Sequence, residues 1–200
     1  MILATAYLPP IWYFEKLLST DAVVIEGHEH FVKQTIRNRA HILSPNGIQS
    51  LIVPVVHENN SRVAIKDKRI SDDIPWQRQH WRSLCAAYQR SAYFEFYQDD
   101  LAPFYEKKYE FLLDYNMELL HFLLGLLQVK KSITISSEYQ GPMETESNDL
   151  RVLCNGGLPK VSGEETTYPQ VFGYKGGFVP GLSIVDLIFN AGPDARKKMS

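Results

Sequence analysis

The sequence predicts an α/β fold: a single domain over residues 1–200, with a mixed, partly parallel sheet and a helical block in the middle of the chain. A strand, a helix and a second strand follow one another within residues 2–25, and this spacing is typical of a βαβ unit, whose strands are parallel. Asn46-Gly47 lies between two extended apolar runs and predicts an antiparallel hairpin. Apolar residues at helical spacing within residues 74–127 predict the helical block.

Strands are expected where short apolar or β-branched runs end at turn residues. The first run stops at Pro9-Pro10, and the hairpin turns at Ser44-Pro45-Asn46-Gly47. Pro54 restricts the end of the second hairpin strand to an edge or a bulge. The expected strands are residues 2–6, 21–25, 35–43, 48–56, 63–70 and 131–136.

Helices are expected where apolar residues recur every three or four positions. Pro75 lies at an early position of the second helix, where proline is well tolerated, and Asp114 or Asn116 is suited to cap the fourth. The inward stripe of the second helix is expected to be Trp81, Leu84, Cys85 and Tyr88. The expected helices are residues 11–18, 74–90, 94–107, 114–127 and 183–189, with a polar turn at 194–199 and an irregular region at 141–177.

Composition excludes several classes of protein. A chain of 200 residues with 44% hydrophobic residues can bury a large core. A net charge of -2 disfavours a nucleic-acid partner, and 12% aromatic residues disfavour disorder. Two cysteines, Cys85 and Cys154, are too few for a disulfide scaffold and fit a reducing compartment. Because residues 1–6 do not resemble a signal peptide and residues 119–129 are too short to span a membrane, we expect a cytoplasmic protein without a membrane span.

Residues 31–41 contain three cations and no acid. If this segment were an extended strand, Lys33, Arg37 and Arg39 would share one face, since side chains alternate along a strand. Arginine forms bidentate bonds with phosphate or carboxylate, and lysine adds a point charge. The segment therefore predicts an anion site, with a solvated charged strand as the plain alternative.

Residues 76–82 place a histidine at the start of a helix, where free N–H groups attract anions. His80 follows Trp76 by about one turn and is a candidate acid or base near neutral pH. The alternative is that Trp76 and Trp81 pack in the core while Arg78 and His80 face water.

His28 and His30 would point the same way on a strand, as two metal ligands do. Glu26, His57 and Glu58 are candidates for further ligands, but nothing in the sequence fixes them nearby, so we expect a loop with solvated histidines and no metal. Glycine-rich nucleotide fingerprints, a nucleophile elbow and paired CxxC motifs are all absent from the sequence.

Residues 168–183 alternate aromatic residues with glycine and proline. Glycine allows close backbone approach and proline fixes the path of the chain, so such segments often form rigid pocket walls. A well-packed irregular tail is the alternative interpretation.

Taken in order, these segments resemble the WbqC-like protein family of bacteria over nearly the whole chain. The matching stretches are residues 7–14, Phe31-x-Lys33 with Arg37-Asn38-Arg39 and Asn46-Gly47, Val53-Pro54-Val55, residues 76–94, Ser136-Ser137-Glu138 and residues 168–193. The chain departs from the family's pattern at Thr5-Ala6, where the family has His-Gln, and at Gly27-His28, where it has acidic residues. It is also shorter and more polar between Glu138 and Tyr168.

The resemblance implies a role in O-antigen and related polysaccharide synthesis, and a group transferase that adds an aminoacyl group such as glycine to a sugar. If this resemblance is applied to the residues above, His80 is expected to be the general base, and Asn38 is expected to orient a phosphate-bearing or sugar-linked donor. No cofactor is expected. The expected donor-binding cations are Lys33, Arg37, Arg39 and Arg78. The expected pocket residues are Tyr7, Trp76, Gln170, Phe178 and Asp186. A non-catalytic binding or scaffold protein of the same pathway is the alternative, and a metal-dependent hydrolase using His28 and His30 is a weaker one.

Overall fold

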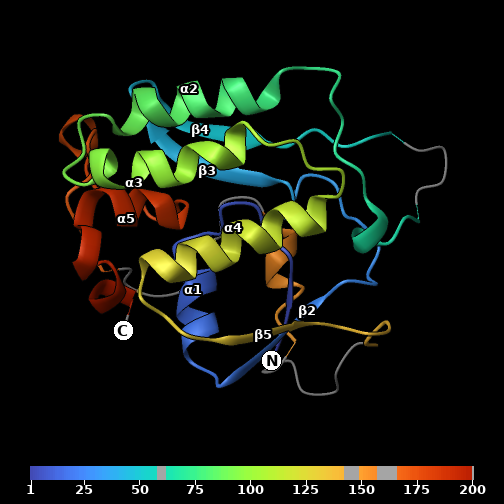
Figure 1. Cartoon of the computed structure of the whole chain (residues 1–200). Helices are drawn as coiled ribbons and strands as arrows, with labels where there is room; N and C mark the ends of the chain where they lie inside the picture. Colours follow the sequence, from blue (N-terminus) through green and yellow to red (C-terminus); the bar gives the residue numbers. More distant parts are fainter. Residues whose placement is uncertain (58–61, 142–148, 157–165, 200) are drawn as a thin grey trace.

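The computed structural model describes residues 1–57, 62–141, 149–156 and 166–199, and it confirms the α/β class. The helices are α1 (Ile11–Leu18), α2 (Trp76–Tyr88), α3 (Phe94–Leu101), α4 (Leu112–Leu126) and α5 (Ile184–Ala191). The strands are β1 (Ile2–Ala4), β2 (Ala22–Glu26), β3 (Arg39–Ser44), β4 (Gly47–Ile52) and β5 (Ser132–Ile135). Figure 1 shows α2 and the β3–β4 hairpin at one end of the molecule and β2 and β5 at the other.

The parallel sheet has the strand order β1-β2-β5. β1, α1 and β2 form the predicted βαβ unit, with Ile2 opposite Val24. On the other side of β1, Ile2 forms a parallel bridge with Asp149, and the Leu150 N–H donates to the Ile2 carbonyl (3.0 Å). β1 is therefore flanked on both sides, and the carboxyl ends of these parallel segments meet at one edge.

The antiparallel hairpin is also confirmed, in a second sheet of its own. β3 and β4 pair from Arg39 opposite Ile52 to Ser44 opposite Gly47, and Gly47 adopts a φ of 100°, which a side chain would disfavour. The end of the hairpin strand at residue 56 and the strand at 63–70 were predicted wrongly. β4 ends at Ile52 before Pro54, and residues 65–67 form a short 3-10 helix.

The predicted strand start at residue 35 is wrong, because residues 33–38 form turns. The Thr35 hydroxyl donates to the Val32 carbonyl (2.8 Å), a local side-chain bond that competes with extended pairing. Lys33, Arg37 and Arg39 consequently do not share one face of a strand.

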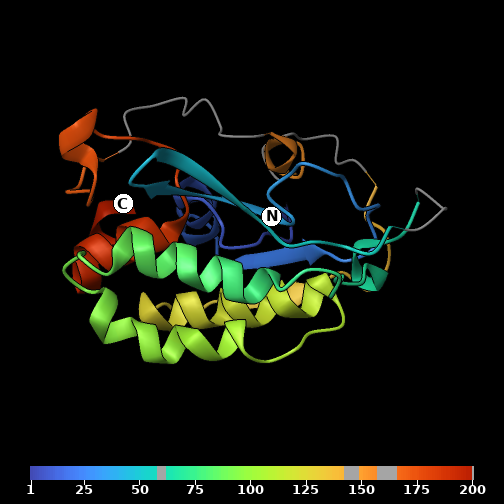
Figure 2. The same ribbon diagram turned by 90° about the horizontal axis from the view of Figure 1, so that it is seen from above.

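The helical block gathers α2, α3 and α4 on one side of the molecule (Figure 2). The predicted helix over 94–107 ends at Leu101, and a 3-10 turn that contains Pro103 follows it. The stripe of α2 is shifted relative to the prediction, since Trp81 and Cys85 are half-buried. Its buried residues are Trp76, His80, Leu84, Ala87 and Tyr88. Within the described ranges, every helix is too short or too polar to span a membrane.

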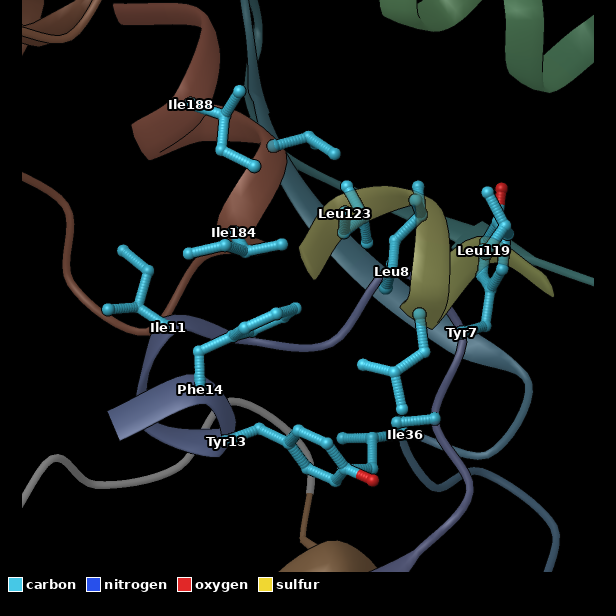
Figure 3. Close-up of a cluster of buried hydrophobic side chains, with 14 of the residues drawn as sticks. Tyr7, Leu8, Ile11, Tyr13, Phe14, Ile36, Leu119, Leu123, Ile184 and Ile188 are labelled. Atoms are coloured by element: carbon cyan, nitrogen blue, oxygen red, sulfur yellow. The ribbon is translucent and has the colours of Figure 1, made fainter. Parts of the chain in front are cut away.

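One hydrophobic cluster joins both sheets to the helices. In Figure 3, Ile11 and Phe14 of α1 face Ile184 and Ile188 of α5. The residues labelled there are buried, and burial of each such large apolar side chain contributes about 1.5–3 kcal/mol. Ser183 caps α5 by accepting from the Val185 N–H (3.4 Å), which fixes where the C-terminal helix joins this core.

Candidate functional site at the carboxyl edge of the parallel sheet

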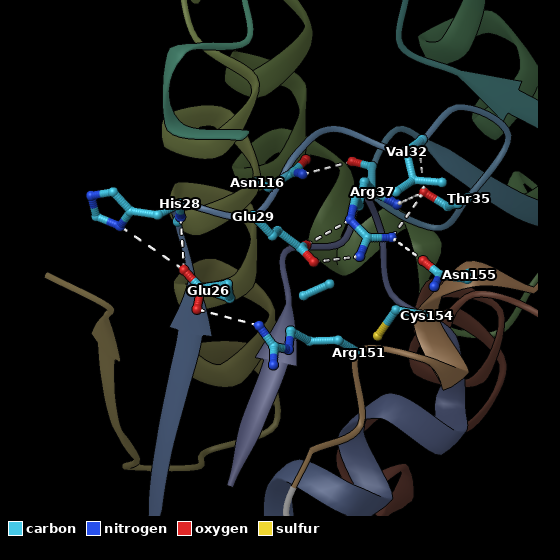
Figure 4. A network of polar contacts seen from close by, with 12 residues as sticks. Glu26, His28, Glu29, Val32, Thr35, Arg37, Asn116, Arg151, Cys154 and Asn155 are labelled. Atoms are coloured by element: carbon cyan, nitrogen blue, oxygen red, sulfur yellow. Dashed lines mark hydrogen bonds and ion pairs between the residues drawn. The ribbon is translucent and has the colours of Figure 1, made fainter. Parts of the chain in front are cut away.

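Charged and polar side chains gather at the carboxyl edge of the parallel sheet (Figure 4). Glu26 ends β2, Ser136 follows β5, and Arg151 lies just beyond the Asp149 bridge to β1. In open α/β sheets, ligands bind outside the carboxyl ends of the strands. We therefore place the candidate site at this edge.

The Glu26 carboxylate is fully buried and accepts hydrogen bonds through both oxygens. Its Oε1 accepts from the Ser136 hydroxyl (2.6 Å) and from the His28 backbone N–H (2.8 Å). Its Oε2 accepts from the Gln140 backbone N–H (2.8 Å) and faces Arg151 Nη1 (3.5 Å). These donors replace water around the carboxylate, as a buried charge requires.

The side chain of His28 lies beside this carboxylate and is 22% exposed. Its Nδ1 is 3.4 Å from the Ser136 hydroxyl oxygen, which also accepts from the Gly27 N–H (3.0 Å). A serine hydroxyl has one proton and two acceptor lone pairs. Since the Ser136 hydroxyl donates to Glu26, the tautomer of His28 that fits this set is the one with the proton on Nδ1, and that tautomer leaves Nε2 unprotonated. We refer to this chain of contacts, from the buried Glu26 carboxylate through the Ser136 hydroxyl to the partly exposed imidazole of His28, as the relay.

Arg37 is buried next to this network and uses its guanidinium inside the protein. Its Nε and Nη2 donate to the two oxygens of Glu29 (2.7 and 2.8 Å). Its Nη1 donates to Asn155 Oδ1 (2.8 Å) and to the Thr35 hydroxyl (3.3 Å), and Asn116 Nδ2 donates to its backbone carbonyl (2.8 Å). Four of the five guanidinium N–H groups are used inside the protein and the side chain is 1% exposed, so the observed geometry favours a positioning role for Arg37, which holds Glu29 in place.

The other predicted donor-binding residues each have different neighbours. Asn38 Nδ2 donates to the Val53 carbonyl (2.9 Å). Arg39 is half-buried, and its buried Nε has no hydrogen-bond partner within the described part of the chain. Lys33 is exposed with its Nζ 3.5 Å from a ring nitrogen of His57, and Arg78 is exposed in the first turn of α2.

The structure brings the predicted residues Tyr7, Trp76 and His80 together in an aromatic cluster. His80 Nδ1 is 2.9 Å from the Tyr7 hydroxyl, and its ring is 5.2 Å from that of Trp76. Burial lowers the pKa of His80 to about 4, although a hydrogen bond with the Ile52 backbone acts in the opposite direction. The imidazole is therefore neutral near pH 7. A base role for His80 stays a prediction, and it requires an acceptor to reach a residue that is 6% exposed.

The remaining predicted pocket residues form a C-terminal cluster. Asp186 Oδ2 accepts from the Tyr168 hydroxyl (2.8 Å) and from Gln170 Nε2 (3.1 Å). Burial raises the pKa of Asp186 to about 6, and these hydrogen bonds partly oppose that shift. The ring of Phe178 packs edge-on against Tyr168 with centroids 5.1 Å apart.

Sequence reasoning missed most of the network at the carboxyl edge. Glu26 and Ser136 could have been found, because Glu26 directly follows one expected strand of the parallel sheet and Ser136 ends another. Arg151 and Asn155 lie in the region expected to be irregular and carry no such signal. His28 and His30 lie beyond β2, which ends at Glu26, so they do not share the strand face that the weaker, metal-binding alternative requires. Across the described ranges, no group of three or more His, Cys, Asp or Glu side chains could hold a metal ion.

Comparisons with known proteins cover nearly the whole chain. The model of the WbqC-like protein family matches residues 5–156 and 160–198. The chain is 28% identical over 219 aligned residues to the uncharacterised protein Rv1507c of Mycobacterium tuberculosis, and the alignment covers 97% of this chain and 94% of that protein. No solved structure matches the chain. The similarity therefore includes the segments that build the polar edge as well as the helices.

Proposed function

This chain belongs to the WbqC-like protein family, and on that premise we propose that it is a cytoplasmic group transferase acting on a sugar-linked substrate in the synthesis of bacterial surface polysaccharides such as O-antigen. An aminoacyl group, for example glycine, is the group that we expect it to transfer. The family resemblance supports the polysaccharide setting. The polar edge of the sheet supports the chemistry.

The observation that carries this proposal is the relay from Glu26 through Ser136 to His28. In an aminoacyl transfer, the acceptor amine or hydroxyl attacks the carbonyl carbon of the donor, and the bond to the donor's carrier breaks. His28 Nε2 takes the acceptor's proton during attack and returns it to the departing carrier. The Glu26 carboxylate keeps the imidazole in the required tautomer through Ser136 and stabilises its positive charge.

Exposed cations supply the binding of a phosphate-bearing donor in this proposal. Lys66 lies next to the relay, because its backbone N–H donates to the Gly27 carbonyl (3.0 Å). Its side chain is exposed and forms no ion pair with any described residue. An ammonium group in this position can neutralise a donor phosphate. The exposed Lys33 and Arg78 and the half-buried Arg39 are further candidate ligands, whereas Arg37 positions Glu29.

Replacing His28 with asparagine tests the role of the relay. The introduced side-chain amide can donate to Ser136 as the histidine Nδ1–H does, but it offers no base. With carbon-13-labelled aminoacyl donors and a panel of nucleotide sugars, mass spectrometry should detect labelled product from the wild-type protein and about 100-fold less from His28→Asn. His41→Asn is the matched control, since His41 is a half-buried histidine that contacts Ser50 on the hairpin (3.1 Å), and it should keep full activity.

The outcomes separate the candidate functions. Wild-type rates in His28→Asn would contradict the assignment of the base to His28, and a loss confined to His80→Asn would give that role to His80. Absence of product from every donor and acceptor pair would favour a non-catalytic binding or scaffold protein. The internal hydrogen bonds of Arg37 favour that alternative, because they occupy four of the five N–H donors that an anionic substrate would use.

A further inference from the structure

A surface pocket of about 440 Å³ lies between the C-terminal end of α2, the hairpin turn and residues 171–175. None of its lining residues belongs to the polar network at the carboxyl edge. The pocket is lined by Pro45, Ala86, Ala87, Gln89, Arg90, Val171, Phe172, Tyr174 and Lys175.

The pocket combines aromatic rings with positive charge and has no acidic residue in its lining. Tyr174 is 79% exposed, and Phe172 beside it is half-buried. Arg90 is exposed and forms no hydrogen bond or ion pair with any described residue. Lys175 Nζ donates to the Pro45 carbonyl (2.8 Å), which leaves two of its three N–H groups for a ligand.

The loop that presents these rings is closed at its base by one glutamine. Gln170 Oε1 accepts from the Val179 N–H (2.8 Å), and its Nε2 donates to the Val179 carbonyl (2.9 Å). The same Nε2 donates to Asp186, which anchors the loop on α5. A loop held in this way loses less conformational entropy when it binds a ligand.

We propose that this pocket binds a phosphorylated ring compound, either a sugar phosphate or a nucleoside phosphate. Tyr174 and Phe172 offer faces on which a sugar or a base can stack. Arg90 and Lys175 offer the charge-assisted hydrogen bonds that a phosphate accepts. The predicted residues Gln170, Phe178 and Asp186 then hold the loop in place and do not themselves contact the ligand. This binding does not depend on the transferase activity proposed above.

Isothermal titration calorimetry of the full chain with glucose 1-phosphate, uridine monophosphate, inorganic phosphate and glucose tests this inference. At least one of the two ring phosphates should bind more tightly than phosphate or glucose alone. Arg90→Gln and Tyr174→Ala should each raise its Kd about tenfold or more, because each removes a direct contact. Binding of glucose 1-phosphate alone identifies a sugar as the ring, and binding of uridine monophosphate alone identifies a base.

Matched controls keep the result specific to the pocket. Arg82→Gln removes an exposed cation of α2, the helix that ends just before Arg90, at a position outside the pocket, and Phe96→Ala removes a ring that is 73% exposed on α3. Both variants should bind the ring phosphate with the wild-type Kd. His28→Asn should do so as well, because His28 does not line the pocket, so a loss of transferase activity in that variant leaves this test unaffected. The inference is overturned if neither ring phosphate binds at millimolar concentration, or if Arg90→Gln and Tyr174→Ala leave the Kd unchanged.

Discussion

Replacing Asp186 with asparagine should change how the stability of the protein depends on pH. Asp186 is 1% exposed, and burial raises its pKa from an ordinary value of 3.8 to about 6. Between these two values the folded protein holds a proton that the unfolded chain has released. The contribution of Asp186 to stability is therefore complete below about pH 4 and is lost as the pH rises through 6.

The size of this effect follows from the shift in pKa. A shift of about two units, at 1.36 kcal/mol per unit, corresponds to about 3 kcal/mol. Urea unfolding followed by tryptophan fluorescence from pH 4 to 7.5 measures it. Relative to the wild-type protein, Asp186→Asn should gain about 2 kcal/mol between the two ends of this range, because part of the effect is already present at pH 4, where the unfolded aspartate is about half ionised. Subtraction of the wild-type curve removes every other titrating group.

His80 has the opposite dependence. Burial lowers its pKa from 6.5 to about 4, so the unfolded chain holds the extra proton and stability increases with pH over this window. The two groups nearly cancel in the wild-type protein, and Asp186→Asn should reveal a steep loss of stability on acidification. If the difference between Asp186→Asn and wild type stays constant within about 1 kcal/mol, the carboxyl does not titrate near 6 and the reasoning is refuted.

Two further substitutions test packing and charge burial. Arg37→Ala should cost about 3–5 kcal/mol in urea unfolding, because it leaves Glu29 buried without its guanidinium partner, and a loss below about 1 kcal/mol would mean that the pair is dispensable. Gly192→Ala should lower the unfolding free energy by about 1–3 kcal/mol, because its Cβ would lie 2.5 Å from the Tyr93 ring at a φ of 54°. Gly177→Ala, at a φ of 86° with no atom within 4 Å of the added Cβ, is its control and should cost less.

The fold could be predicted where its determinants are close together in the sequence. The βαβ unit depends on three consecutive runs within residues 2–25, and the hairpin depends on Gly47 at a tight turn. The strand predicted from residue 35 failed for an equally local reason, since the Thr35 hydroxyl bonds the Val32 carbonyl and turns the chain.

The candidate site could be predicted only in part, because its partners are distant in sequence. The ion pair of Arg37 joins a residue eight positions earlier, but Asn155 comes from 118 positions later. The residue types around Arg37 indicated an anion site. Only the fold shows that the guanidinium is already paired with the Glu29 carboxylate. Likewise, Tyr7 contacts His80 although the two residues are 73 positions apart in the sequence. The burial of His80 in that cluster lowers its pKa, which explains why this histidine at a helix start is neutral near pH 7.

The position of β1 between β2 and Asp149 has a consequence for the protein as it leaves the ribosome. The first strand to be synthesised obtains its last neighbour only after residue 149 has emerged, and β2 waits for β5 at residue 132. At a synthesis rate of about 5–20 residues per second, the interval between the synthesis of β1 and that of residue 149 is roughly 7–30 seconds. During this time β1 keeps an unpaired backbone edge, which other nascent chains can join. Chains truncated before residue 149 should therefore aggregate or bind chaperones more than the complete protein does.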